Sequence, residues 1–575
     1  MAWSVYPRQS KVRIPIMFVL GLVGTGLEAL GIGLVIPVMT TMSKATTGSS
    51  GSVLQPLFNF FGIRDVGTMV GVAVLCIVAT YFVKNFYKLF YIYISSRVGN
   101  FTSHQVTSQL FRSYLTRPYT FHLQRNSSDL LNSMQQEAGM TIGLVVSIVG
   151  LVQEIILASA VIWLMVYTEP VAAVSTVLIL VLGSVIYLKV TKPIVTRFGQ
   201  QRQLIQAPLM RYLLQGFAGV KDIKVLGRSN DFLNQYEKQN LVVQDVSLRY
   251  GILKSIAPMW TELLAMTGLT VVVWVMVWQD RPPDRIIPLL GLFVIATWRF
   301  VPSVNSVVNL TNSIRYSRPA VESVYCEFEY IKSQNNIVKT QIVFNDKVEM
   351  KNLTFNYSNT VMPSLRDVNI VVRKGETVGF IGPSGAGKST LVDVLLGLLP
   401  QTSGELLIDG VEMQEHNLEW QSTIGYVSQA IYLTDDTVSR NVAFGIAEAD
   451  VDEVALERAL KSAQLWDFVE SLPDKTHTIV GERGVRVSGG QRQRIGIARA
   501  LYHDPQVLVL DEATSSLDIE TETEVMSAIR ALQGFKTIII VAHRLSTVQH
   551  CDRLYRVEDA QIVAEGSFKE LVKLI

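Results

Sequence analysis

Six long apolar stretches limit the fold of this chain more than any other feature of its sequence. They run over residues 14–39, 68–94, 141–167, 171–188, 256–278 and 286–310. A helix needs about 20 mostly apolar residues to cross the hydrocarbon core of a bilayer. Only 17% of the residues are charged, against about 25% in soluble domains. We therefore expect an all-α membrane domain with six transmembrane helices.

The first residues, MAWSVYPRQSKVR, contain no small-residue cleavage motif. We interpret the stretch that follows as a retained membrane anchor rather than a signal peptide. Cys76, Cys326 and Cys551 are far apart and form no CxxC pair, which disfavours a disulfide framework or a zinc site. The 51 Lys and Arg residues nearly balance the 49 Asp and Glu residues, so we expect no nucleic acid as partner.

Basic residues gather in alternate connections between the apolar stretches. The second and fourth connections carry Arg97, Arg112, Arg117 and Arg125, and Lys192, Arg197, Arg202, Arg211, Lys221, Lys224, Arg228, Lys238 and Arg249. The outer connections carry only Lys44, Arg64, Arg281 and Arg285. By the positive-inside rule, both termini and the two basic connections lie in the cytoplasm. These connections contain few glycines and prolines, so we expect the helices to continue well beyond the bilayer.

The apolar stretches stop near residue 331, and the polar segment 333–342 reads as a linker. We therefore divide the chain into a membrane domain over 1–332 and a soluble domain over 343–575. The soluble part alternates amphipathic helices with short apolar runs at 368–372, 378–381, 507–510 and 537–541. This alternation predicts an α/β domain with a largely parallel sheet.

A phosphate-binding loop follows the predicted strand 378–381. The segment 382–390 reads GPSGAGKST and precedes an apolar helix. Its glycines allow backbone N–H groups to close around phosphate, and the helix N-terminus adds a favourable dipole. The candidate nucleotide-binding residues are Gly382, Ser384, Gly385, Gly387, Lys388, Ser389 and Thr390. Lys388 is placed to reach the β- and γ-phosphates, and Ser389 to ligate Mg²⁺.

Two further motifs extend this site. The strand 507–510 ends in Asp511 and Glu512, of which one can hold Mg²⁺ and the other can activate an attacking water. The sequence VSGGQ precedes a basic amphipathic helix, and such a glycine-rich helix N-terminus is a second anion site. Its candidate residues are Ser488, Gly489, Gly490 and Gln491.

Together these motifs resemble the ATP-binding cassette (ABC) family, in which VSGGQ precedes an acidic strand of this kind. The other family landmarks appear in family order: Tyr357 as the adenine-stacking aromatic, Gln429 as the Q-loop glutamine, 481–484 as the X-loop, Asp518 in the D-loop 516–518, and His543 as the switch histidine. One departure is Val487, where the family usually has Leu, and this apolar exchange leaves the serine and glycines in place.

The resemblance implies the roles of these residues and the assembly. ATP and Mg²⁺ are the implied cofactors, with Mg²⁺ held by Ser389, Gln429 and Asp511. Glu512 is the implied general base, and His543 contacts the γ-phosphate. The family forms head-to-tail dimers, so each ATP lies between Lys388 of one chain and the partner's Ser488. With every motif present, a homodimer has two hydrolysis-competent sites.

Six spans ahead of one ATPase domain resemble the exporter-type half-transporter of this family. The implied fold is an all-α polytopic membrane domain fused to an α/β P-loop ABC ATPase domain. Importers of the family usually keep spans and ATPase on separate chains, which argues against import. Cytoplasmic turns near 115–118 and 219–224 are the expected coupling helices, which transmit ATPase closure to the spans.

Ionisable residues within the spans are candidates for binding the transported substrate, because charge in lipid is expensive. The basic candidates are Arg299, Lys84, Lys88, Lys254 and Arg315. Two acids, Glu28 and Glu154, lie in the first and third spans. The competing interpretations are that the bases extend to the membrane interface or that an acid pairs with Arg299.

The outer segment 53–63 is strongly apolar, and it can lie among lipid headgroups or pack on the span ends. With a basic inner cavity and the segment GVKDIKVLGR, it resembles the bacterial flippases of lipid-linked oligosaccharides. That resemblance implies an ATP-driven homodimer of the inner membrane. The implied homodimer moves a polyprenyl-pyrophosphate oligosaccharide from the cytoplasmic to the outer leaflet, as in protein glycosylation.

Other functions remain as alternatives. The nearest are a multidrug exporter and a lipid exporter, including a lipid A-type flippase. A peptide exporter with a processing protease would need a domain before the spans, and only about a dozen residues precede residue 14. A non-transporting channel or sensor of the family usually has a degenerate catalytic site, whereas Glu512 is present here.

Overall fold

The computed structural model describes residues 6, 8–33, 66–168, 170–279, 283–333, 343–358, 360, 362–413, 417–514, 519–542 and 544–571. The chain divides into two compact units. The first contains Met1–Arg117 and Arg125–Asn336, and the second contains Pro118–Gln124 and Ile337–Ile575. The outer segment 53–63, Asp518 and His543 lie outside the described residues, as does the side chain of Arg299.

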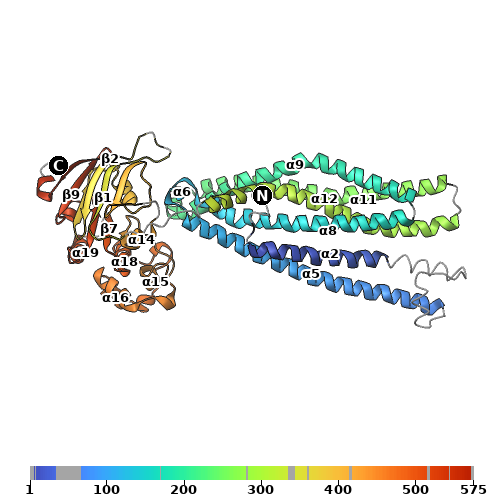
Figure 1. The fold of residues 1–575 in the computed structure, drawn as a ribbon, viewed down its shortest axis with the longest axis horizontal. Helices are drawn as coiled ribbons and strands as arrows, with labels where there is room; N and C mark the ends of the chain where they lie inside the picture. The colour runs from blue at the N-terminus through green and yellow to red at the C-terminus, as the bar shows by residue number, and fades with distance from the viewer. Residues whose placement is uncertain are drawn as a thin grey trace. The chain divides into compact units, whose positions relative to one another are not determined.

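The first unit is a bundle of long helices (Figure 1). Its long elements are α2 (Arg8–Gly33), α5 (Val66–Thr116), α8 (Ala138–Thr168), α9 (Pro170–Ala218), α11 (Ser229–Trp278) and α12 (Pro283–Ser333). Within the described residues, five helical segments are long and apolar enough to cross a membrane, and they lie in α2, α5, α8, α9 and α11. The helix α5 alone has 51 residues, or about 75 Å at 1.5 Å per residue, which is longer than the roughly 30 Å hydrocarbon core of a bilayer.

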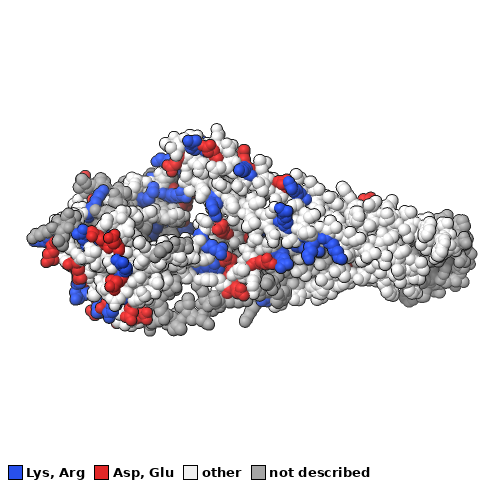
Figure 2. Space-filling view, turned by 90° about the horizontal axis from the view of Figure 1, so that it is seen from above, with Lys and Arg blue, Asp and Glu red and all other residues white. Residues whose placement is uncertain are grey.

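The helices of this bundle pack in recurring pairs. The most extensive contacts join α9 with α11 and α8 with α12, and α2 packs on both α5 and α8. Small residues permit close approach: a Cβ at Gly199 of α9 would lie 2.5 Å from the Tyr316 carbonyl of α12. Figure 2 shows almost no charged side chain over the apolar part of α9, which agrees with a lipid-facing surface.

Two buried ion pairs join distant helices near the ends of the bundle. Arg117, at the end of α5, lies 2.7 Å from the carboxylate of Glu327 on α12 and also donates to the Glu327 carbonyl at 3.1 Å. Arg125 reaches the other oxygen of the same carboxylate at 3.6 Å. A second pair joins Arg202 of α9 to Glu137 at 3.2 Å. Each pair ties together segments that are far apart in sequence.

The second unit contains two sheets. One is antiparallel, in the order β2-β1-β4-β5, and the other has six strands in the order β10-β9-β3-β8-β7-β6. The strands are β1 (Lys347–Phe355), β2 (Leu365–Arg373), β3 (Thr377–Ile381), β4 (Ser403–Ile408), β5 (Val411–Glu412), β6 (Ile424–Val427), β7 (Val507–Asp511), β8 (Thr537–Val541), β9 (Arg553–Glu558) and β10 (Gln561–Gly566). The pairs β9–β3–β8–β7–β6 are parallel, which confirms the predicted α/β fold.

The helices of this unit cover both faces of the six-stranded sheet. They are α13 (Lys388–Leu395), α14 (Leu418–Ser422), α15 (Val438–Val442), α16 (Glu453–Ser462), α17 (Trp466–Glu470), α18 (Gly489–Tyr502), α19 (Ile519–Arg530), α20 (Leu545–Val548) and α21 (Phe568–Leu571). Alternate residues of β7 point to opposite faces, so Val507 and Val509 join the core beneath α13. Leu508 and Leu510 join the core beneath α16 and α18. Both cores hold the ends of β3 and β7 in place for the site.

Candidate functional site

The loop between β3 and α13 forms the base of an open cavity of about 850 Å³. Gly382, Gly385 and Gly387 have φ angles of 150°, 82° and 103°, which side-chain-bearing residues rarely adopt. Gly387 is also the N-cap of α13. The loop therefore takes a path that only this glycine spacing permits, and it turns backbone N–H groups toward the cavity. Ser384, Ser389 and Thr390 line the same cavity.

Lys388 lies folded over the loop. Its Nζ donates to the carbonyl oxygens of Gly382 at 2.8 Å and Pro383 at 2.9 Å. Burial lowers the pKa of Lys388, and this effect is opposed by the nearby carboxylates of Glu512 and Asp511. An anion in the cavity would give this ammonium a stronger partner than the two carbonyls.

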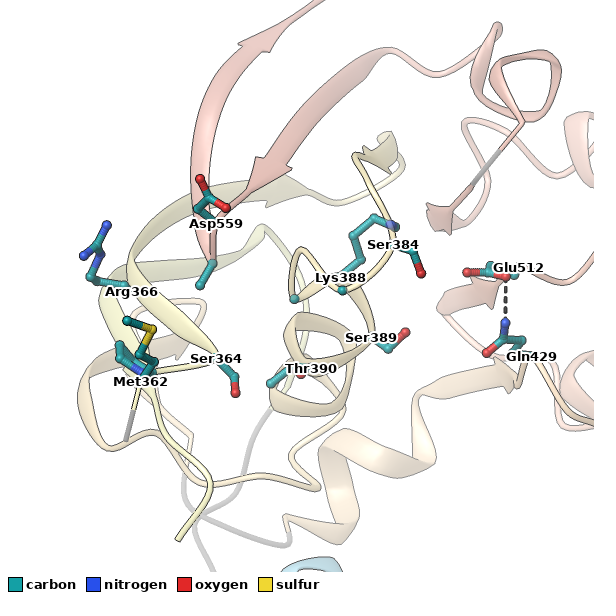
Figure 3. Close-up of a pocket in the computed structure, with 14 residues that line it drawn as sticks. Met362, Ser364, Arg366, Ser384, Lys388, Ser389, Thr390, Gln429, Glu512 and Asp559 are labelled. Carbon is teal, nitrogen blue, oxygen red and sulfur yellow. Dashed lines mark hydrogen bonds between the residues drawn. The ribbon is translucent and has the colours of Figure 1, made fainter. Parts of the chain in front are cut away.

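The loop faces a pair of side chains from the opposite wall. Gln429, after β6, donates from Nε2 to Oε2 of Glu512, after β7, at 2.8 Å. In Figure 3, Ser389 points toward this pair, whereas Lys388 lies beside Ser384. Glu512 has a φ of 50°, a conformation that costs about 1 kcal/mol or more for a residue with a side chain. This turn directs its carboxylate into the cavity.

Asp511 has two neighbours that sequence reasoning missed. Burial, followed by the charge of Asp511, raises the pKa of Tyr426 on β6. Burial, followed by the charge of Asp511, raises the pKa of Asp393 on α13 to about 6. No strand was predicted at β6, and no motif marks Tyr426 or Asp393.

The far end of the cavity is lined by Met362, Arg366 and Asp559 (Figure 3). Sequence reasoning also missed these residues: Met362 precedes β2, Arg366 is the second residue of β2, and Asp559 follows β9, and no motif marks any of them. Tyr357 lies outside this lining, and its hydroxyl is 3.4 Å from Thr390 Oγ1. It lines an adjoining cavity of about 330 Å³ together with Pro400 and residues of α6 (Tyr119–Gln124).

The VSGGQ segment forms a capping box at the start of α18. Ser488 Oγ accepts from the Gln491 N–H at 3.2 Å, and Gln491 Oε1 accepts from the Ser488 N–H at 2.9 Å. Ser488 is exposed and Gln491 is half-buried. None of Ser488, Gly489, Gly490 and Gln491 lines the Lys388 cavity in the described part of the chain.

A short helix lies at or beside each segment predicted as a coupling turn. The segment 115–118 covers the end of α5 and is followed by α6, whose Gln124 donates to Ser358 Oγ at 2.7 Å within the second unit. The segment 219–224 overlaps α10 (Val220–Val225), which belongs to the first unit and has no buried residue.

The predicted substrate residues fall into different environments. Lys84 of α5 is buried and pairs with Glu28 of α2 at 3.5 Å. Lys88 is exposed and lines a cavity with Glu28 and Glu154. Arg315 donates to the Leu188 carbonyl at 2.8 Å. Lys254 is exposed. The four bases whose side chains the structure describes therefore differ in burial and in partner.

The loop geometry gives a first testable expectation. A Cβ at Gly387 would lie 2.7 Å from the Ser364 carbonyl oxygen, at a φ that already disfavours a side chain. We expect Gly387→Ala to lower ATP affinity at least tenfold, because the loop must shift next to Lys388. The matched control is Gly410→Ala, which also has a positive φ (79°) but no atom within 4 Å. Equal ATP affinities of the two variants, measured by nucleotide titration, would contradict this explanation.

Comparisons with known proteins agree with the geometry. The model of the ABC transporter transmembrane region matches residues 16–297, and the ABC transporter ATP-binding model matches residues 365–515. The ATP-dependent lipid A-core flippase of Cupriavidus metallidurans is 28% identical over 560 residues, covering 96% of this chain and 91% of that protein. The flippase of the same name from Pseudoalteromonas translucida is 29% identical, with coverage of 84% and 83%.

A solved structure shows the same fold. A bacterial Atm1-family ABC exporter with ATP bound superposes with a TM-score of 0.83 at 21% identity, over 99% of this chain and 96% of the other. The two matched regions, their order on one chain and the shared fold lead to one assignment. The protein belongs to the ABC transporters and is an exporter-type half-transporter, in which an ATP-hydrolysing domain drives a helical transmembrane domain.

Proposed function

We propose that two copies of this chain form a homodimer in the inner membrane and use ATP to flip a lipid-linked oligosaccharide to the outer leaflet. The observation that carries the ATP-driven part is the cavity in which Lys388 and Ser389 face the Gln429–Glu512 pair. The ATPase domain lies in the cytoplasm, in keeping with the basic connections on that side.

In this proposal ATP binds with its phosphates on the glycine loop and Lys388. The donor set fits Mg²⁺, because hydroxyl, amide and carboxylate oxygens are the ligands this hard cation prefers. Ser389, Gln429 and Asp511 would hold it, and it would neutralise charge on the phosphates. Glu512 orients and deprotonates the attacking water, and His543 contacts the terminal phosphate.

The exposed capping box of α18 supports the homodimer. Ser488 and the two glycines present a helix N-terminus with free anion-binding capacity, yet they line no part of the Lys388 cavity. A second copy can bring this N-terminus to the phosphates, so each ATP contacts both chains. The second expected coupling helix, α10, has no buried residue, so its surface is available for contact with the other chain.

Membrane-embedded charge supports a lipid substrate with a polar head. Lys88 lies in a span and lines a cavity that also contains Glu28, Glu154 and two serines. Charged groups persist in spans where they serve a polar ligand or its path. The relatives named as lipid A-core flippases favour a lipid over a soluble drug and make a lipid A-type substrate the second candidate.

Transport in sealed proteoliposomes tests this proposal. We expect ATP-dependent loss of a polyprenyl-pyrophosphate oligosaccharide from the leaflet that faces the ATPase domain, and no loss with a non-hydrolysable ATP analogue. Transport of lipid A but not of the oligosaccharide would replace the first substrate with the second. ATP hydrolysis without transport of either lipid would overturn the lipid assignment.

A further inference from the structure

A polar groove of about 340 Å³ lies among the apolar helices of the membrane domain. It is formed by α2, α5, α8 and α12, all within the first unit. The side chains that matter here are Glu28, Lys88, Glu154, Trp298, Ser303 and Ser306. Glu154 is 13 residues beyond the start of its apolar stretch at residue 141, a depth of about 20 Å at 1.5 Å per residue. The groove therefore reaches into the middle of the hydrocarbon layer.

The charges around the groove divide into one paired set and one separated set. Glu28 has a cationic partner in Lys84 at 3.5 Å, and the Lys84 side chain is only 10% exposed. Lys88, one turn along the same face, forms no ion pair within 4 Å with any described residue. It lines the same groove as the carboxylate of Glu154. The groove thus holds a cation and an anion that face a common space without touching.

Hydroxyls and an indole line the groove together with the acid Glu154. Ser303 and Ser306 of α12 share this lining, and Ser303 is 3% exposed. Trp298, one helical turn before Pro302 on the same helix, also lines the groove and leaves 73% of its surface exposed. A carboxylate and an indole that line the same groove are suited to an organic ammonium group.

From this arrangement we infer that the groove binds a headgroup that carries one phosphate and one primary ammonium. The phosphate lies at Lys88, and the ammonium lies between Glu154 and Trp298. Among the described residues the two separated charges, Lys88 and Glu154, sum to zero and match a zwitterion, whereas a headgroup with only negative charge meets the carboxylate of Glu154 as well as Lys88. This inference goes beyond the glycan proposal, because it assigns a second headgroup class to the membrane domain and requires neither ATP nor a glycan.

Binding of short-chain phospholipids to the detergent-solubilised full chain tests the inference. The probes are phosphatidylethanolamine, phosphatidylcholine and phosphatidylglycerol, followed by tryptophan fluorescence, with Trp298→Phe identifying the responding residue. We expect phosphatidylethanolamine to bind about tenfold more tightly than phosphatidylglycerol. Glu154→Gln is expected to remove this preference, and Lys88→Gln to weaken both lipids. A fourth probe, an amine-bearing phosphoglycolipid, distinguishes the two lipid classes that carry this headgroup chemistry, which are phospholipids and phosphoglycolipids.

The controls make the same chemical changes outside the groove. Glu262→Gln on α11 and Lys189→Gln on α9 both alter exposed residues of other helices, and both are expected to keep the wild-type preference. Equal binding of the three phospholipids to the wild-type chain, or loss of preference in Glu262→Gln as much as in Glu154→Gln, would overturn the inference. Failure of glycolipid transport would leave this binding pattern unchanged, so the two proposals fail separately.

Discussion

Glu512→Gln is expected to bind ATP as the wild-type chain does and to hydrolyse it at least 100-fold more slowly. The change keeps the shape of the side chain, and its amide oxygen can still accept the 2.8 Å hydrogen bond from Gln429. An amide cannot take a proton from water, and general-base catalysis is worth about 10² to 10⁴ in rate. Phosphate release by the purified chain in lipid, together with ATP titration, measures both quantities.

A matched control separates loss of the base from a general loss of negative charge. Glu405 lies on β4, is exposed and is remote from the cavity lining. Glu405→Gln should hydrolyse ATP at the wild-type rate. Hydrolysis by Glu512→Gln within threefold of wild type would show that another group activates the water.

Glu327→Ala is expected to destabilise the membrane domain strongly. The Glu327 side chain is 7% exposed and the Arg117 side chain 3% exposed, so the change leaves a buried guanidinium without its carboxylate. Breaking a buried pair by removing one partner typically costs about 3–5 kcal/mol. The apparent melting temperature of the full chain in detergent is expected to fall by several degrees or more, with ATP affinity of the surviving folded protein unchanged.

The same helix offers a matched control for this prediction. Glu322 pairs with Arg318 at 2.8 Å, one turn apart on α12, and its side chain is 49% exposed. Exposed pairs of this kind contribute about 0.3–0.5 kcal/mol. Glu322→Ala should therefore melt close to wild type, and similar melting temperatures for Glu322→Ala and Glu327→Ala would show that the buried pair contributes no special stability.

Motifs that act through local backbone geometry were the most predictable part of this protein. The loop 382–390 joins a strand to a helix as expected, because its glycines and its place after an apolar run specify the turn. The capping box of α18 follows from the spacing of Ser488 and Gln491 for the same reason. Three of the four predicted strands lie in the parallel arrangement as β3, β7 and β8, since buried parallel strands are continuous apolar runs. The fourth, 368–372, belongs to β2 and lies in the antiparallel sheet instead.

Contacts that depend on how helices rotate against one another were not predictable. Lys84 and Lys88 share a helix face, yet Lys84 is buried on Glu28 while Lys88 is exposed to the groove. The spacing of residues along the helix cannot predict this difference in burial, because the spacing is the same whichever neighbouring helix the turn contacts. The pair of Arg117 and Glu327 spans 210 positions, and the antiparallel sheet β2-β1-β4-β5 likewise depends on pairings between separate segments.

The chain enters and leaves α6 through two arginines, Arg117 and Arg125, that both reach the single carboxylate of Glu327. The residues just before and just after α6 are therefore held at one point of α12, and all three charged groups belong to the first unit. Loss of the single Glu327 carboxylate would release both ends of this connection at once rather than one at a time.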